Sequence, residues 1–82
     1  MKLRILFFSF LRDIVGAEEV QFDAPEGVAD VSGMLEALYA EWPPLRDWDG
    51  RIRVAVDLEY VGRDHAVSEG QEIAVMPPVQ GG

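Results

Sequence analysis

Two adjacent glycines, Gly81 and Gly82, end the 82-residue sequence, and the reactive group they offer is the terminal carboxylate. Glycine has no side chain, so this end is a thin, permissive strip that is able to enter a narrow channel in another protein. A carboxylate is a poor electrophile. The chemistry we expect is therefore activation by ATP to an acyl-adenylate, followed by attack of a sulfur nucleophile to give a thiocarboxylate at Gly82. The alternative is a frayed end without function, because terminal residues are commonly disordered.

The residues before the glycines are Pro77, Pro78, Val79 and Gln80. Each proline fixes its φ near about −65° and offers no amide donor, and Pro77 favours an extended conformation at Met76. Neither a helix nor a central strand continues through such a pair. We therefore divide the chain into a folded domain, residues 1–76, and an extended tail, residues 77–82.

Side chains that bind metals or act as nucleophiles are scarce in the rest of the chain. There is no cysteine, which excludes disulfides, iron–sulfur ligation, thiolate zinc sites and a catalytic thiol. His65 stands alone, and Asp47 and Asp49 are better explained by turn chemistry than by a calcium loop. No phosphate-binding glycine loop or nucleophile–base pair is present. We expect no metal, no intrinsically bound cofactor and no free-standing enzyme.

Charge and hydropathy limit the partners of the chain. Seven basic against fifteen acidic residues give a net charge of −8, which disfavours nucleic acid and favours partners with a basic surface. Solubility of a small domain is the alternative explanation of this charge. No apolar run approaches the ~18 residues of a membrane span, so we expect no membrane association. Nothing requires an oxidising compartment, and the cytoplasm is the expected location.

The domain that carries the tail shows alternating and helical patterns of apolar residues. Leu3, Ile5 and Phe7 alternate with other residues as in a strand, and Asp30 is a suitable N-cap for a helix that Pro43 must stop. We expect strands at residues 2–8, 18–24, 51–56, 58–61 and 72–76, a helix at residues 31–42, a helical turn or wide loop at residues 10–15, and connections at residues 45–50 and 68–71. The expected core is Leu3, Ile5, Phe7, Val20, Phe22, Leu35, Leu38, Val54, Val56, Ile73 and Val75.

This order of elements predicts an α+β fold of the β-grasp (ubiquitin-like) type, a mixed sheet packed on one main helix. In that arrangement the first and last strands are parallel neighbours. Leu6 and Phe8, on the face without the helix, are then expected to lie near Met76, which would form an apolar patch at the exit of the tail. The alternative is that residues 45–48 fold over these side chains as a second small core.

Several segments along nearly the whole chain resemble one family, the small, sulfur-carrying subunits of molybdopterin synthase. The most specific segment is the ending Pro77-Pro78-Val79-Gln80-Gly81-Gly82. Shorter segments agree with it in the expected places: Leu6-Phe7-Phe8, Leu11-Arg12-Asp13-Ile14-Val15-Gly16, Ala55-Val56-Asp57 and Glu69-Gly70-Gln71-Glu72-Ile73. Two residues depart from the family pattern: Asp57 stands where asparagine is usual, and Met76 where an aromatic residue is common.

The resemblance implies a protein that is adenylated at Gly82 by a ubiquitin-activating-like adenylyltransferase, which uses ATP with magnesium. It then implies acceptance of sulfur from a donor, and insertion of the tail, Gly81 included, into the large subunit of molybdopterin synthase. There the thiocarboxylate would donate sulfur to precursor Z, cyclic pyranopterin monophosphate. The implied partner-binding residues are Leu6, Phe8, Tyr60, Met76, Pro77, Pro78, Val79 and Gln80.

Two other functions remain open from the sequence. One is a sulfur carrier of another pathway, such as the thiazole branch of thiamin synthesis, although those carriers look shorter and lack the Pro-Pro-Val segment. The other is a ubiquitin-like interaction module with an inert terminus, because a fold does not fix a function.

Overall fold

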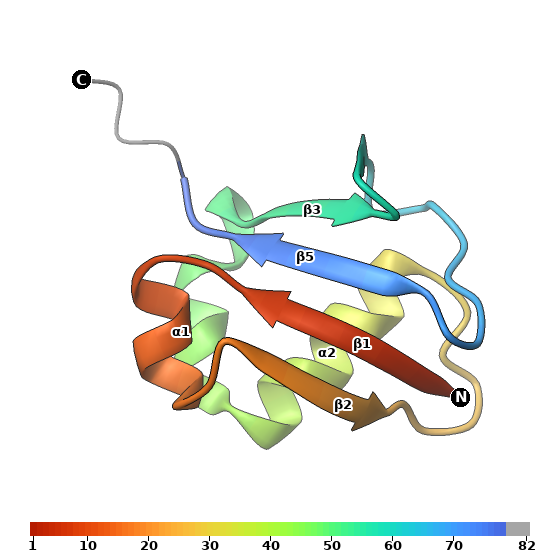
Figure 1. Cartoon of the computed structure of the whole chain (residues 1–82), viewed down its shortest axis with the longest axis horizontal. Helices are drawn as coiled ribbons and strands as arrows, with labels where there is room; N and C mark the ends of the chain where they lie inside the picture. Colours follow the sequence, from red (N-terminus) through yellow and green to blue (C-terminus); the bar gives the residue numbers. More distant parts are fainter. Residues whose placement is uncertain (79–82) are drawn as a thin grey trace.

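A five-stranded sheet and one long helix form the two layers of the fold, and the computed structural model describes residues 1–78 (Figure 1). The elements in chain order are β1 (Lys2–Phe7), α1 (Phe10–Val15), β2 (Glu19–Asp23), α2 (Val31–Glu41), the 3-10 helix η1 (Pro43–Arg51), β3 (Arg53–Val56), β4 (Glu59–Val61) and β5 (Glu72–Met76). The strands lie in the order β2-β1-β5-β3-β4, with β1 and β5 parallel and the other neighbours antiparallel. The expected α+β arrangement, a mixed sheet on one main helix, is confirmed.

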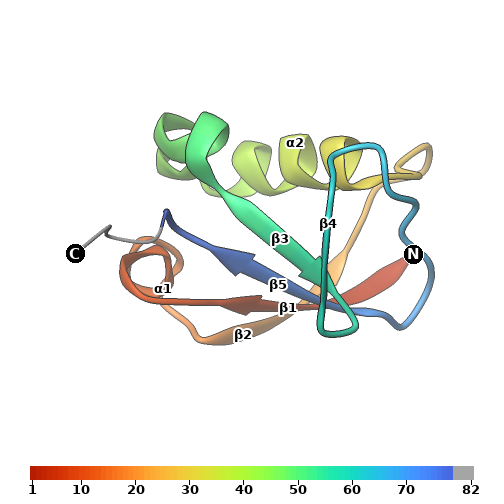
Figure 2. The same cartoon turned by 90° about the horizontal axis from the view of Figure 1, so that it is seen from above.

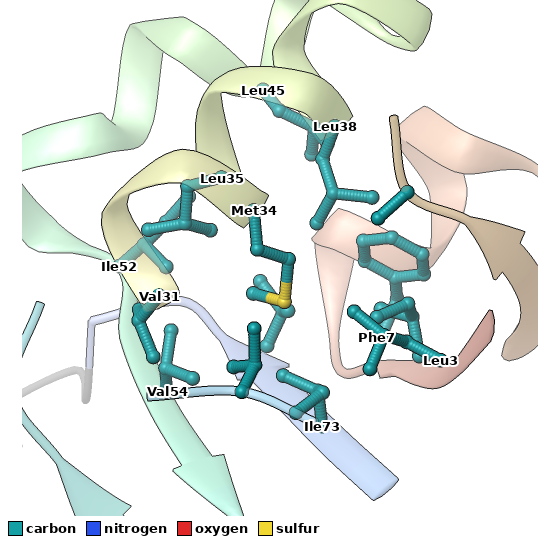
Figure 3. Packing of buried hydrophobic residues seen from close by; sticks show 14 of the residues in the cluster. Leu3, Phe7, Val31, Met34, Leu35, Leu38, Leu45, Ile52, Val54 and Ile73 are labelled. Carbon is teal, nitrogen blue, oxygen red and sulfur yellow. The ribbon is translucent and has the colours of Figure 1, made fainter. Parts of the chain in front are cut away.

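The core lies between α2 and one face of the sheet (Figures 2 and 3). The Asp30 side chain caps α2 by accepting a hydrogen bond of 2.8 Å from the amide of Gly33. Leu35 and Leu38 are 1% and 0% exposed, as expected. Burying each such side chain contributes roughly 1.5–3 kcal/mol. Buried members from both layers are Leu3, Ile5, Phe7, Val31, Met34, Leu35, Leu38, Val54, Val56, Ile73 and Val75.

The first strand and the edge strands differ slightly from the sequence prediction. Val20 and Phe22 are only partly buried, although they pack against the core as expected, because β2 is an edge strand with one neighbour. Four expected strands are shorter by one or two residues in all. Residues 10–15 form a helix, which agrees with the first of the two expected alternatives, and Gly16 ends it at φ 87°, where the absence of a Cβ removes the steric cost.

Residues 45–50 are not a simple connection. They lie within η1, whose Leu45 is fully buried in the core beneath α2. Trp48 packs on Phe10 with ring centroids 4.7 Å apart. The alternative in which residues 45–48 cover Leu6 and Phe8 is therefore wrong, because their apolar side chains are used on the helical side of the molecule. Within residues 1–78, the second face of the sheet is left without a covering helix (Figure 2).

Candidate functional site

The end of β5 is the point at which the tail leaves the sheet. The strand ends at Met76, and Pro77 and Pro78 follow it outside any regular element, as two residues without amide donors require (Figure 1). Both prolines are partly buried. The expected site residues Val79, Gln80, Gly81 and Gly82 lie outside the described residues.

Parallel pairing of β1 with β5 brings Phe8 to the exit of the tail. In this register Leu6 lies opposite Ala74 and Phe7 opposite Val75. Phe8 and Met76 are the next residues along these two neighbouring strands. The Phe8 amide also donates a 3.2 Å hydrogen bond to the Val75 carbonyl. Side chains alternate along a strand, and the buried Phe7 and Val75 therefore place Phe8 and Met76 on the opposite, uncovered face. The Phe8 side chain is 46% exposed there.

Tyr60 completes this surface from the other edge of the sheet. It pairs with Ala55 of β3, Ala55 pairs with Ala74 of β5, and Ala74 pairs with Leu6 of β1. These four residues therefore form one row across the open face of the sheet. The Tyr60 hydroxyl donates to Met76 Sδ over 3.7 Å, and the Tyr60 residue is 66% exposed. We call the four expected residues Leu6, Phe8, Tyr60 and Met76 the tail-exit patch. The structure brings these four together on one face.

The alternation of exposed and buried residues along β3 breaks down at Ala55. Ala55 belongs to the open face, but it is only 7% exposed. Ala55 and Ala74 lie between larger residues in the same row, Leu6 on one side and Tyr60 on the other. Two larger side chains of the tail-exit patch, Phe8 and Tyr60, are exposed, whereas the small methyl group of Ala55 is buried.

A hollow of about 310 Å³ lies beside Phe8, and the sequence alone did not reveal it. The end of β1 supplies its apolar wall, and Arg12 forms a 3.1 Å ion pair with Glu18 among its lining residues. The hollow joins α1, β1 and the start of β2, and no pattern of period two or 3.6 marks such a meeting of three elements. Its lining residues are Leu6, Phe7, Phe8, Arg12, Glu18 and Glu19.

The turn between β3 and β4 holds the departure from the family pattern at Asp57. Asp57 and Leu58 have φ values of 48° and 74°, so both central residues of this two-residue turn are left-handed, as in a type I′ hairpin. Asp57 Oδ1 accepts a 3.2 Å hydrogen bond from the Glu72 amide and ties the turn to β5. Aspartate therefore supports a tight turn here, at the end of the sheet opposite the tail.

Two titratable groups with shifted pKa values, Tyr39 and Asp49, lie on the helical side of the sheet, away from the tail-exit patch. The Tyr39 hydroxyl donates to Asp49 over 2.6 Å, and Arg63 donates to the same carboxylate over 3.0 Å. These hydrogen bonds lower the pKa of Asp49, and burial together with the neighbouring carboxylate raises the pKa of Tyr39. The three residues connect α2, η1 and the segment after β4, so their role is to hold the scaffold.

Two further findings concern residues 1–78. No helix in this range is long and apolar enough to cross a membrane. No group of three His, Cys, Asp or Glu side chains in the same range is placed to hold a metal ion. His65 is exposed in a loop, and its backbone carbonyl accepts a 2.9 Å hydrogen bond from the Val31 amide at the start of α2.

Comparison with known sequences matches residues 5–82 to the model of the ThiS family. The molybdopterin synthase sulfur carrier subunit of Escherichia coli K12 is 35% identical over 82 residues, which cover 98% of this chain and 99% of that protein. The protein of the same name from Chlamydomonas reinhardtii is 30% identical over the full length of both chains. The match therefore includes both the folded part and the glycine ending.

Comparison with solved structures gives the same fold. Small archaeal modifier protein 1 of Haloferax volcanii superposes with a TM-score of 0.82 at 31% identity, over the whole of both chains. A chain in the complex of subunits 1 and 2 of the molybdopterin-converting factor from Helicobacter pylori has a TM-score of 0.68 at 24% identity, also over both whole chains. The neighbours are ubiquitin-like β-grasp proteins, which confirms the expected fold class.

Proposed function

The chain belongs to the ThiS family, and from this premise we propose that it is the sulfur carrier subunit of a molybdopterin synthase. The observation that carries the proposal is the full-length similarity to proteins of that name, which includes the last residues of the chain. A second observation supports the proposal. The tail leaves the sheet beside the tail-exit patch, where a partner that accepts the tail would dock.

The reacting group in this proposal is the carboxylate of Gly82. A ubiquitin-activating-like adenylyltransferase transfers AMP from ATP, with magnesium, to this carboxylate and releases pyrophosphate. A sulfur donor then supplies the nucleophile that displaces AMP, and the carbonyl carbon keeps one oxygen and gains sulfur as a thiocarboxylate. Gly81 and Gly82 keep this end thin enough to be handled inside another protein. The carrier itself binds no cofactor in this scheme.

The second partner is the large subunit of molybdopterin synthase. The tail-exit patch docks against it, while residues 77–82 extend into its active site. The thiocarboxylate sulfur is donated to precursor Z, the cyclic pyranopterin monophosphate, and hydrolysis returns Gly82 to the carboxylate. This division of labour agrees with a domain of residues 1–76 that provides the docking surface and a tail that provides the reactive atom. We place the reaction in the cytoplasm, without nucleic acid or membrane as a partner.

The test is the mass of the intact protein after incubation with the activating enzyme, ATP, magnesium and a sulfur donor. We expect a gain equal to the replacement of one oxygen by sulfur, which fragmentation places at Gly82. The product, mixed with the large subunit and precursor Z, should then form molybdopterin. An unchanged mass would favour the interaction module with an inert terminus. A thiocarboxylate that serves only thiazole formation would favour the thiamin branch.

A second candidate function follows from the similarity to small archaeal modifier proteins at 30 and 31% identity. In that function the activated Gly82 carbonyl is attacked by an amine of a target protein, and AMP leaves as an amide bond forms. The same activation reaction, run with candidate lysine-containing acceptors in place of the sulfur donor, separates the two. Acceptors that gain the mass of this chain less one water would support the modifier.

A further inference from the structure

Four of the seven basic side chains in this acidic protein form ion pairs within residues 1–78, and two of the other three lie close to the tail. Each paired arginine lies within 3.1 Å of a carboxylate. Arg51 and Arg53 form no ion pair with any residue in the range 1–78. The arginines that do form ion pairs are Arg4, Arg12, Arg46 and Arg63.

The two unpaired arginines line one hollow of about 310 Å³, and Pro78 of the tail is part of the same lining. The remaining lining residues are Gly50 and Ile52. Arg53 lies opposite Met76 in the pairing of β3 with β5, so the hollow adjoins the tail-exit patch. Two positive charges therefore flank the base of the tail in a chain whose net charge is −8.

Arg51 is held in place by an aromatic ring. Its guanidinium carbon lies 4.8 Å from the centroid of the Trp48 ring, and Trp48 is itself packed on Phe10. A guanidinium stacked on a ring loses less conformational freedom when it binds a carboxylate, because it is already oriented. Arg53 is fixed at its backbone by the sheet and is exposed at its side chain.

We infer that Arg51 and Arg53 form a carboxylate-binding pair that orients the protein receiving the tail, so that an Asp or Glu of that partner lies at the hollow beside Pro78. This inference rests on the proposed function, because it requires a partner that takes up the tail. The net charge favours a partner with a basic surface overall. A carboxylate within such a surface is attracted to the arginine pair and repelled by the acidic side chains around it, and it therefore helps to fix the docking orientation.

A protein carboxylate fits this place better than a small free anion. An ion pair that stays in water contributes little, about 0–1 kcal/mol. A carboxylate delivered by a docked protein is different, because the apolar contacts of Tyr60 and Met76 next to the pair exclude water as they form. The pair then gains a charge-assisted, bidentate hydrogen-bond geometry that a solvated anion does not achieve.

The experiment compares Arg53→Glu with Lys2→Glu in binding to the purified large subunit, by titration calorimetry at low and high salt. Both variants change the charge equally, and Lys2 also lacks an ion pair within residues 1–78, but it lies at the start of β1, at the opposite end of the sheet. We expect Arg53→Glu to weaken binding by about tenfold or more, with less of a difference at high salt, and Lys2→Glu to stay within about twofold of the parent. Arg53→Lys should lose less than Arg53→Glu, and all variants should melt like the parent.

The possible results distinguish a failure of the arginine-pair inference from a failure of the proposed sulfur-carrier function. If the parent binds and transfers sulfur while Arg53→Glu and Lys2→Glu bind equally well, the arginine pair is not a recognition element and the proposed function stands. If the parent does not bind the large subunit, both fail together. Parent-like binding by Arg53→Glu, together with displacement of the Arg53 side-chain NMR signal by millimolar inorganic phosphate, would assign the hollow to a small anion instead.

Discussion

Phe8 shows how a single residue acquires a role from its register rather than from its type. Phe7 and Phe8 are adjacent and identical, yet Phe7 is 3% exposed and packs edge-on against Trp42, with 5.8 Å between ring centroids. Phe8 is 46% exposed on the opposite face, beside the residue from which the tail departs. The pleat of β1 assigns one ring to the core and the other to a surface that a partner can cover.

The first prediction concerns Phe8→Asp. The fold should persist, because the side chain is not in the core, and binding to the large subunit should weaken by about tenfold or more, since docking would desolvate a charge without a counter-ion. Calorimetric titration gives the affinity, and thermal melting gives the stability. Leu58→Asp is the matched control, because Leu58 is 89% exposed at the far end of the sheet. Equal affinities of both variants and the parent would remove Phe8 from the interface.

The hairpin of β3 and β4 carries strain that the rest of the described backbone mostly avoids. Leu58 has a φ of 74°, where a side chain costs roughly 1 kcal/mol or more and glycine costs nothing. The Leu58 side chain is almost fully exposed, so packing within this domain does not offset the backbone strain. Asp57, by contrast, tolerates its positive φ because short polar side chains bond locally, here to the Glu72 amide.

Leu58→Gly is therefore expected to stabilise the domain by about 0.5–1 kcal/mol, as urea denaturation would measure. Leu58→Ala is the control: it removes the same exposed side chain but keeps the Cβ, and it should not stabilise. A loss of stability in Leu58→Gly would show that the Leu58 side chain makes contacts that outweigh the strain of its backbone.

The contact between α2 and η1 depends on a polar link. The buried Tyr39 ring delivers its hydroxyl to Asp49, and Arg63 reaches the same carboxylate. Because these hydrogen bonds lower the pKa of Asp49 in the folded state, the stability that they give is present above the unfolded pKa of about 3.9 and is lost as pH falls through the lower folded value.

We predict that Asp49→Asn costs about 1 kcal/mol near pH 7 and progressively less as the pH is lowered from about 4 to 2. Chemical denaturation at a series of pH values provides the measurement. Asp47→Asn makes the same charge change two residues away and should show a smaller effect, because Asp47 makes no side-chain hydrogen bond with residues 1–78. A penalty for Asp49→Asn that is constant with pH would contradict the role of its ionised form.

The elements that the sequence predicted well are those with a clear period and a clear stop. The helix of α2 has both, because Asp30 caps it and Pro43 ends it, and the last strand was placed at its observed bounds. The 3-10 helix η1 was missed, since its one buried residue, Leu45, produces no repeating pattern. The hollow lined by Arg51 and Arg53 was missed for another reason: the end of η1, the start of β3 and Pro78 form it, and only the fold brings Pro78 to the other two.

At the scale of the whole molecule, the residues that stabilise the fold and the residues proposed to dock the partner in sulfur transfer lie on different faces of the sheet. One face carries α2 and the core, and the other carries the tail-exit patch, which no helix among the described residues covers. Parallel pairing of the first and last strands places the exit of the tail at the end of the sheet opposite the β3–β4 turn. Substitutions in the last residues should therefore act on transfer and leave the core unchanged.

The last prediction tests this separation with the Gly82 deletion and Gly81→Val. Deleting Gly82 moves the terminal carboxylate back by up to about 3.5 Å along an extended chain, which exceeds what catalytic positioning tolerates. Valine at position 81 adds a side chain where a channel is expected to be narrow, and it penalises any positive φ. Both variants should melt like the parent and lose sulfur transfer by about tenfold or more, which corresponds to roughly 1.4 kcal/mol of transition-state stabilisation.

Molybdopterin formation by each variant, measured beside its melting curve, gives the result. Preformed thiocarboxylate, wherever it can be made, separates defects in activation from defects in transfer. Gly70, which has a φ of 83° in the turn before β5, supplies the opposite control, because Gly70→Val should lower the melting temperature through backbone strain. It should leave transfer by the folded fraction intact. Parental turnover by the Gly82 deletion would show that Gly82 does not carry the sulfur, and the interaction module with an inert terminus would then explain the chain better.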